Sequence, residues 1–259
     1  MSHIDRSFQR LESLRLFHIE AKDLVNYLET FQSLPRLFSL CFLVGDCFSL
    51  DLGRIYELVF RLPVLKRVTI SAMVELPTIS LQLNTTHQYS TIERMFIAHT
   101  CRLDELITLL SYTPQLCELI CQNTLKSDES MPLNILSTLS ALRSLTFQNC
   151  DMKFDECEPF LRMICSPLRN LRVSTNDDPA YLDANRWERL ISHQMVNLRE
   201  IHYTHCKTFL DHQQIPEHHA SINRFVSLFR RQQRWTIKLS SIIDNGGNQN
   251  IVYSISPRK

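Results

Sequence analysis

A triplet of apolar residues with the spacing L-x-x-L-x-L recurs along this chain. Its first copy is Leu11, Leu14 and Leu16, and its last copy is Leu198, Ile201 and Tyr203. The copies between them span Leu37–Phe42, Leu65–Ile70, Ile92–Ile97, Leu116–Cys121, Leu142–Phe147 and Leu168–Val173. The last residues of consecutive triplets are 24 to 30 residues apart. The pattern therefore indicates a repeat that runs through most of the chain.

The spacing within a triplet predicts a short strand with one buried face. Side chains alternate between the two faces of a strand, so the second and third triplet positions point the same way, and the first turns inward one bend earlier. The period lies in or just beyond the range of roughly 20–29 residues that is typical of leucine-rich repeats. One repeat cannot offset the ordering of its own backbone, at about 1–2 kcal/mol per residue, so the repeats must stack on one another.

Between the triplets the apolar period becomes helical, with residues at i, i+3, i+4 and i+7. Prolines at 35, 63 and 114 stand two residues before a triplet, where a proline ends a helix and favours extended backbone. Asp177-Asp178-Pro179 has the composition of a helix start. The one-sided stripes are Ile55, Leu58, Val59 and Leu62; Leu103, Leu106, Ile107 and Leu110; Phe154, Cys157, Leu161 and Ile164; and Trp187, Leu190, Ile191 and Met195.

These alternating periods predict an α/β fold, namely a leucine-rich-repeat solenoid, or horseshoe, over residues 1–230. Parallel strands joined by right-handed crossovers would form a concave sheet, and helices would cover the convex side. Residues 71–89 lack a helical stripe, and we expect an extended or irregular convex segment there. A last helix is expected over Ile222–Phe229, and residues 231–259 should form a C-terminal cap resembling a β-hairpin. The first repeat should expose its buried face, so that upstream sequence or a partner would cover it.

Composition narrows the range of functions. Among the 259 residues, 28 Lys and Arg balance 27 Asp and Glu to a net charge of +1, which argues against nucleic-acid binding. None of the 4 glycines lies in a phosphate-binding motif, and the odd number of cysteines, 9, argues for reduced thiols. Neither a signal peptide nor an apolar run of about 20 residues is present, so we expect no membrane contact and a cytoplasmic or nuclear protein.

Candidate chemistry in the sequence does not favour an enzyme, and we expect no cofactor and no metal. The histidines and cysteine at His202, His205, Cys206, His212, His218 and His219 match no zinc-finger spacing. The acidic pairs Asp104-Glu105, Asp128-Glu129 and Asp155-Glu156 lie at expected helix starts or in loops, where the helix dipole explains them. No nucleophile motif accompanies them.

The residues between the triplet positions point out of the predicted concave face. The early repeats place large apolar and basic residues there, as buried aromatic and arginine anchors of interfaces require. The alternative is that these side chains pack against a loop or against one another across the sheet. The candidate partner-binding residues are Arg15, Phe17, Leu43, Arg67, Arg94, Phe96 and Ile120.

Several longer strings resemble the F-box/leucine-rich-repeat family, in particular an invertebrate group. They are LDELITLLSYTPQLCELIC at Leu103–Cys121, DMKFDECEPFLRMI at Asp151–Ile164, VSTNDDPAYLDANRWERLISHQMVNLREI at Val173–Ile201, and NIVYSIS at Asn250–Ser256. The resemblance implies a substrate-recognition subunit of an SCF-type ubiquitin ligase, which holds a target protein on its concave face. In that family an N-terminal F-box binds a Skp-type linker, but the few residues before Leu11 match no F-box. A stand-alone scaffold or inhibitor without a ligase link is the alternative.

Overall fold

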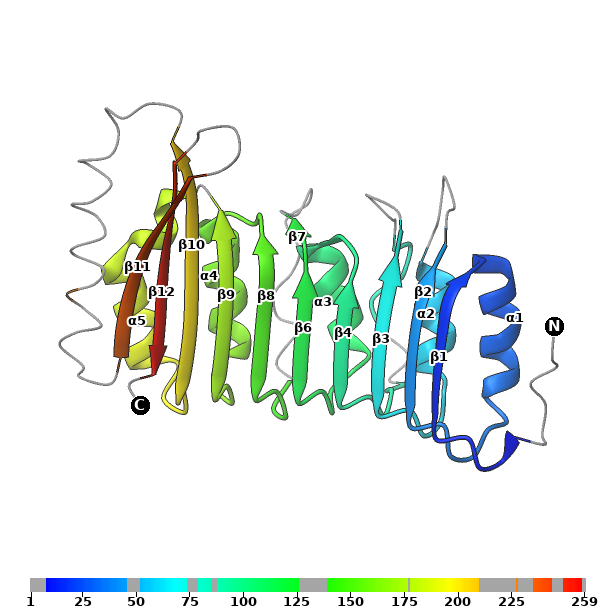
Figure 1. The fold of residues 1–259 in the computed structure, drawn as a ribbon. Coiled ribbons are helices and arrows are strands. Elements are labelled where there is room, and N and C mark those ends of the chain that lie inside the picture. The colour runs from blue at the N-terminus through cyan, green and yellow to red at the C-terminus, as the bar shows by residue number, and fades with distance from the viewer. Residues whose placement is uncertain are drawn as a thin grey trace. The chain divides into compact units, whose positions relative to one another are not determined.

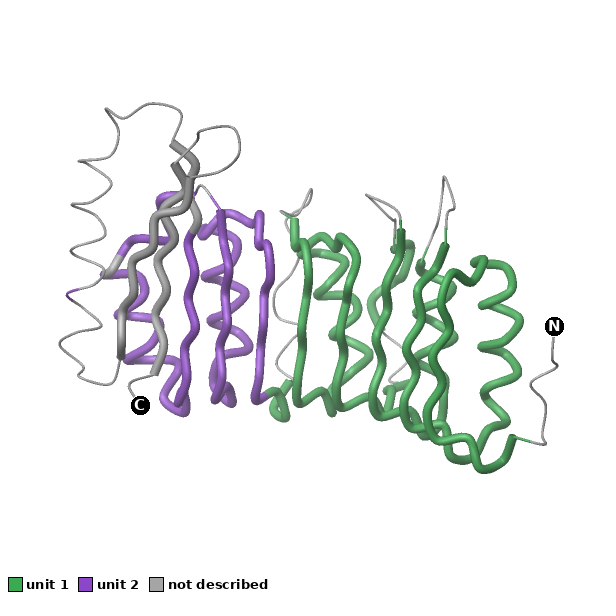
Figure 2. The backbone as a smooth tube through the Cα atoms, viewed as in Figure 1, with its two compact units in different colours: residues 1–142 green, residues 143–259 purple. Residues whose placement is uncertain are grey.

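The computed structural model describes residues 8–45, 52–73, 79–84, 88–125, 139–176, 178–209, 227, 235–243 and 249–257. The chain divides into two compact units, residues 1–142 (unit 1) and residues 143–259 (unit 2), shown in Figure 2. Unit 1 combines helices with parallel strands, and unit 2 combines helices with two parallel and two antiparallel strand pairings, so the predicted α/β class is confirmed. The predicted boundary at residue 230 between repeats and cap stays a prediction.

Unit 1 contains five parallel strands that lie side by side in chain order (Figure 1). They are β1 (Ser13–Ile19), β2 (Ser39–Val44), β3 (Arg67–Ala72), β4 (Arg94–Ala98) and β6 (Glu118–Gln122). The middle residues of successive triplets are register partners, as Val68 is of Leu40 and of Met95. Two short strands, β5 (Cys101–Arg102) and β7 (Thr124–Leu125), form a separate parallel pair. The predicted parallel pairing of the triplets is thus confirmed in this unit.

The helices of unit 1 lie on one side of its sheet (Figure 1). They are α1 (Ala21–Phe31), α2 (Gly53–Phe60) and α3 (Leu103–Ser111). Both stripes predicted for this unit are buried, with Leu62 lying just after the end of α2. The helix α1 was not among the predicted stripes, although its buried residues Leu24, Leu28 and Phe31 have helical spacing. Between β3 and β4 the described residues 79–84 and 88–93 form neither helix nor strand, as predicted.

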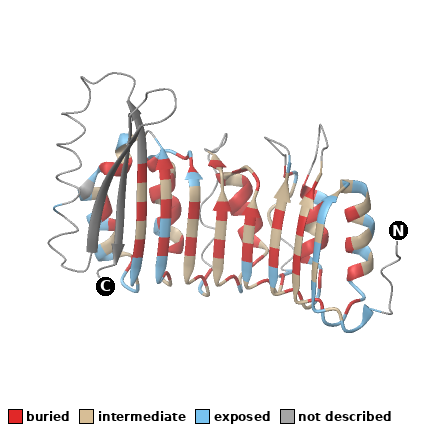
Figure 3. Cartoon of the chain, in the orientation of Figure 1, coloured by how far each residue is buried: buried red, intermediate tan, exposed pale blue. Residues whose placement is uncertain are grey.

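Burial follows the triplets closely (Figure 3). In the second to seventh triplets every apolar position is buried, with at most 3% of any side chain exposed. The first triplet differs, because Leu11, Leu14 and Leu16 are only half-buried. The expected exposure of the first repeat is therefore confirmed in part: its inward face is covered on one side by α1 and β2 and keeps some exposure on the other.

Three strands end in the same backbone conformation. His18, Asn123 and Asn149 have φ values of 52°, 55° and 51°, in the left-handed region that few non-glycine residues adopt. Each lies two residues after the last apolar residue of its triplet. In β1 this conformation accompanies a bulge, because the register shifts between Leu16 and Ile19.

A polar pair lies inside the core of unit 1. The Tyr56 hydroxyl lies 2.7 Å from Nε2 of His99, and Nδ1 of His99 lies 2.8 Å from the carbonyl oxygen of Thr100. Since a carbonyl only accepts, Nδ1 carries the proton and Nε2 accepts from the tyrosine. Burial lowers the pKa of His99 to about 4, so the imidazole is neutral near pH 7.

Unit 2 begins with the parallel strands β8 (Ser144–Cys150), β9 (Asn170–Asn176) and β10 (Glu200–Phe209). Strand β12 (Gln249–Pro257) pairs antiparallel with β10, and β11 (Trp235–Ile243) pairs antiparallel with β12. The predicted antiparallel pairing near the C-terminus is confirmed, with longer strands than expected. The predicted turn at residues 244–247 and the predicted helix over Ile222–Phe229 lie outside the described residues, except for Ser227.

The helical part of unit 2 comprises α4 (Phe154–Ile164), the 3-10 helix η3 (Pro179–Leu182) and α5 (Ala184–His193). The predicted helix start at residues 177–179 is η3, in which Asp178 caps the backbone N–H of Ala180 at 3.0 Å. The other oxygen of Asp178 accepts the backbone N–H of Phe154 at 2.7 Å, so one carboxylate caps two helices.

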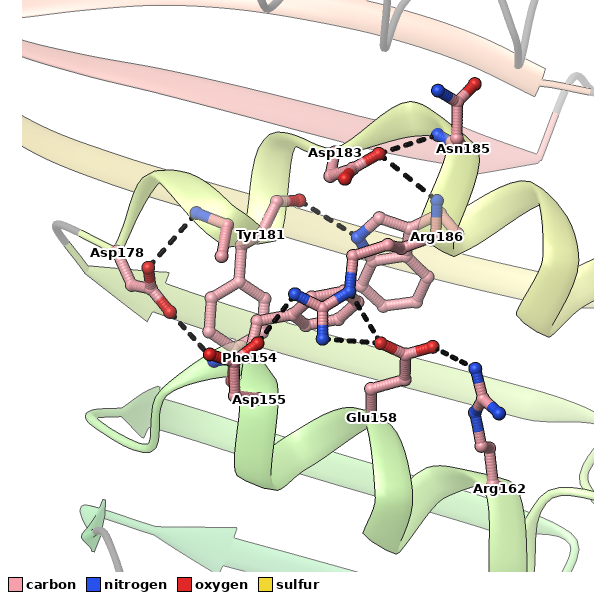
Figure 4. A network of polar contacts seen from close by, with 11 residues as sticks. Phe154, Asp155, Glu158, Arg162, Asp178, Tyr181, Asp183, Asn185 and Arg186 are labelled. Carbon is pink, nitrogen blue, oxygen red and sulfur yellow. Dashed lines mark hydrogen bonds and ion pairs between the residues drawn. The ribbon is translucent and has the colours of Figure 1, made fainter.

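An ion network joins α4 to α5 (Figure 4). Nε of Arg186 donates to Oε2 of Glu158 at 2.6 Å, and its Nη1 donates to Oδ1 of Asp155 at 2.7 Å. Arg162 donates to the other oxygen of Glu158. The Arg186 guanidinium also lies 4.5 Å above the ring centroid of Phe154. The Glu158 side chain is only 6% exposed, and an arginine contacts each of its two carboxylate oxygens.

Candidate functional site

The face of the unit 1 sheet that points away from the helices carries the candidate binding residues. We call it the outer face of unit 1 and define it by the alternate strand residues that are not buried. Its first row consists of Ser13, Ser39, Arg67, Arg94 and Glu118, which are register partners from β1 to β6. Its second row consists of Arg15, Cys41, Thr69, Phe96 and Ile120. A third row contains Leu43, Ser71 and Ala98.

All seven residues predicted from the sequence lie in unit 1 and on this face. Arg15, Arg67 and Arg94 are exposed, and Phe17 is 62% exposed. The other three, Leu43, Phe96 and Ile120, are half-buried. Their burial agrees with the alternative that these side chains partly cover one another across the strands, so the face is less apolar than the sequence indicated.

The register brings some of these residues together and separates others. Arg67 lies directly opposite Arg94, and Phe96 lies directly opposite Ile120. Arg15 belongs to the second row on β1, two strands away from the arginine pair. Phe17 does not continue a regular row, because it lies at the β1 bulge.

The arginine pair on β3 and β4 is the main electrostatic feature of this face. Neighbouring strands are about 4.8 Å apart, and like charges directly opposite each other destabilise a sheet. Nε of Arg94 is 3.6 Å from Oε2 of Glu118, but these side chains are 61% and 40% exposed, so the pair contributes about 0–1 kcal/mol. Within the described part of the chain, Arg67 has no carboxylate partner.

Glu118 is the charged residue of this face that the predicted site omitted. It occupies an outward position of its triplet, and counting back from the aligned triplets would have placed it beside Arg94. Its negative charge partly neutralises Arg94. Arg67 has no such partner within the described residues.

Among the described residues, the other groups singled out in the sequence do not assemble into a site. His202 is half-buried, whereas His205 is fully buried and lies 3.1 Å from Oγ1 of Thr175 through its Nδ1. The side chains from Cys206 to His219 lie outside the described residues. Among the residues that are described, no three potential ligands gather as a metal site would require.

Two of the three acidic pairs lie at helix starts, as the sequence indicated, and Glu105 and Glu156 act as caps there. Glu105 accepts the backbone N–H of Arg102 at 2.9 Å and that of Ile79 at 3.1 Å, which fixes the start of α3. Burial raises the pKa of Glu105 despite these bonds. Glu156 has the corresponding position in α4, and Asp128-Glu129 lies outside the described residues.

A hollow of about 520 Å³ opens on the helical side of unit 1. One wall is the stacked pair Phe60 and Tyr112, whose ring centroids are 5.1 Å apart. Its carboxylate, Glu57, is already paired with Arg54 and Arg61. The hollow is lined by Glu57, Phe60, Arg61, Leu62, Pro63, Gln88, Tyr89, Thr91 and Tyr112. This set offers no nucleophile next to a base.

Two further observations concern the described residues alone. None of their helices has both the length and the apolar character needed to cross a membrane. Seven cysteines whose side chains are described are free thiols, and five of these are buried.

The comparisons with known proteins add no family to this picture. Neither a protein-family model nor a curated protein matches the chain.

Proposed function

We propose that this chain is a non-catalytic protein-binding module that holds its partner on the outer face of unit 1. The carrying observation is the cross-strand register, which gathers exposed arginines and two large apolar side chains from three different strands into adjacent rows. A row of exposed arginines next to apolar side chains is the composition that interface anchors have.

We propose a leucine-rich-repeat solenoid as the architecture behind this face. The in-register triplets, the intervening helices and the repeated left-handed residues at the strand ends support this architecture. In such an array each repeat adds one strand to a continuous face, so a binding surface is built from equivalent positions of consecutive repeats.

We further propose that the bound protein is a substrate delivered to an SCF-type ubiquitin ligase, as the resemblance to the F-box/leucine-rich-repeat family implies. The second candidate function, a stand-alone scaffold or inhibitor, would use the same face. The two functions share one binding surface and differ in whether a Skp-type linker and a cullin also bind.

An affinity purification from native cells with the full-length gene product tests both levels of this proposal. We expect a Skp-type linker and a cullin to co-purify together with a target protein. If the target is captured in cells that lack the linker and no cullin co-purifies, the ligase role is wrong and the scaffold role stands.

Variants of the outer face test the binding surface itself. Phe96→Asp should abolish target capture, while Lys22→Glu on the exposed side of α1 should leave it unchanged. Equal capture by both variants would refute the assignment of this face. Circular dichroism of the purified variants verifies that each one is folded.

A further inference from the structure

We propose that the partner of this face is an acidic protein segment with an apolar side chain. Its carboxylates would lie over Arg67 and Arg94, and its apolar side chain would lie against Phe96 and Ile120. This inference rests on the proposed function of the outer face and specifies the chemistry of what it binds.

Charge is distributed unevenly between this face and the rest of the chain. The three rows contain three cations, Arg15, Arg67 and Arg94, and one anion, Glu118, so their net charge is +2. The whole chain has a net charge of only +1. The face therefore complements a negatively charged surface although the protein as a whole is nearly neutral.

The arginine pair favours binding of an anion. Arg67 and Arg94 are register partners on adjacent strands, so their guanidinium groups repel each other in the free protein. A carboxylate placed between them would relieve that repulsion and could accept two parallel N–H bonds from a guanidinium fork. The unpaired state of Arg67 within the described residues leaves its donors available.

The rows also fix the spacing of the partner's side chains. The second row follows the first by two residues along each strand, which is about 6.6–7 Å. In an extended peptide, residues i and i+2 on the same side are separated by the same distance. An extended partner that runs parallel to the strands, in the same N-to-C direction, would therefore present an Asp or Glu followed two residues later by an aromatic or large aliphatic residue.

The same row argues for a carboxylate-bearing protein and against a nucleic acid. Glu118 belongs to the row that would meet the anion, and it would repel a phosphate backbone at the next position. The apolar neighbours are a half-buried phenylalanine and an isoleucine, which form a shallow apolar contact and not a stacking platform for bases.

Selection from a displayed library of random peptides on the immobilised full chain tests this inference. We expect selected peptides to be enriched in Asp or Glu two positions before an aromatic or large aliphatic residue. Binding of a selected peptide, measured by fluorescence anisotropy, should weaken at about 0.5 M NaCl, where exposed charges are screened within a few ångströms.

Charge variants give the matched controls. Arg67→Glu should weaken binding of a selected peptide by about tenfold or more, which is the loss expected for a charge-assisted pair. Lys22→Glu changes the net charge by the same amount on α1 and should have less than about a twofold effect. The exchange Arg94→Glu with Glu118→Arg keeps the net charge and separates the two cations, and it should also weaken binding.

The outcomes separate this inference from the proposed function. Selected peptides that lack acidic residues but lose binding in Phe96→Ala would overturn the inference and leave the binding face intact. Acidic peptides that bind Arg67→Glu as well as the wild type would also overturn it, as would no enrichment over a bare surface. The proposed function is judged independently, by target capture from cells.

Discussion

Replacement of the half-buried Arg186 by alanine should destabilise unit 2 more than the loss of an exposed charge in its helices does. The substitution removes two N–H donors from Glu158 and the cation above the Phe154 ring. Glu158 stays behind in a place where its side chain is only 6% exposed, with Arg162 as its remaining cation.

The magnitude follows from these contacts. A hydrogen bond to a charged group contributes about 1.5–3 kcal/mol, and a cation–π contact about 0.5–1 kcal/mol. The pair with Asp155 adds little, because that carboxylate is 75% exposed. Arg162 keeps one oxygen of Glu158 satisfied, so we expect Arg186→Ala to lower the free energy of unfolding by about 2–4 kcal/mol.

Urea unfolding measured by tryptophan fluorescence is a suitable assay. The chain has 2 tryptophans, and Trp187 is fully buried beside Phe154, with ring centroids 5.2 Å apart. In a Trp235→Phe background, Trp187 becomes a local reporter of the contact between α4 and α5. Arg162→Ala is the matched control and should cost about 0–1 kcal/mol, because that arginine is 46% exposed.

The pH dependence provides a second check on the same network. Burial works to raise the pKa of Glu158, but hydrogen bonds from Arg162 and Arg186 outweigh it and lower the pKa below its usual value. A lowered carboxylate pKa contributes stability that is present above the unfolded pKa and is lost as the pH falls through the folded pKa. The difference between wild type and Arg186→Ala should therefore shrink at acidic pH. An effect no larger than that of Arg162→Ala at neutral pH would refute the reasoning.

Three further predictions concern other parts of the chain. His99→Gln should remove an acid-sensitive loss of stability: because the folded pKa of about 4 lies below the unfolded value of about 6.5, wild type should lose about 3 kcal/mol as the pH falls between these values, as urea unfolding over that range would measure. Asp178→Ala should lower the midpoint of thermal unfolding by the equivalent of about 1 kcal/mol, and Asp178→Asn should restore part of it, because the cap needs an oxygen acceptor. Leu119→Ala should cost about 2–5 kcal/mol and Ile120→Ala less than about 1 kcal/mol in the same assay, since the first is fully buried and the second faces outward; similar values would mean that the strand faces are misassigned.

The pattern of apolar residues alone predicted those strands and helices whose signal lies within a few neighbouring residues. Leu40 and Phe42, or Leu171 and Val173, are two residues apart and point to one face of a strand wherever that strand lies. In the same way, Phe154, Cys157, Leu161 and Ile164 share one face of a helix whatever covers them. The parallel pairing followed from the repeat length, since a parallel neighbour needs a long crossover between strands.

The candidate site could be predicted residue by residue but not as an arrangement. Alternation identifies Arg67, Arg94 and Phe96 as outward-facing from their own triplets. The strand register makes Arg67 and Arg94 direct neighbours and places Glu118 in their row, an arrangement that no single triplet shows. The half-burial of Phe96 depends on its neighbours on other strands, so no pattern within β4 could have revealed it.

The sequence by itself therefore determined which residues are buried in the second to seventh triplets, where most helices lie and which side chains face outward. The tertiary structure decided contacts between residues far apart in the chain: Arg186 with Glu158, 28 residues away, and the Tyr56 hydroxyl with His99, 43 residues away. The physical reason is that a periodic pattern fixes the direction of a side chain relative to its own backbone, whereas partners and charges are fixed by how separate elements pack.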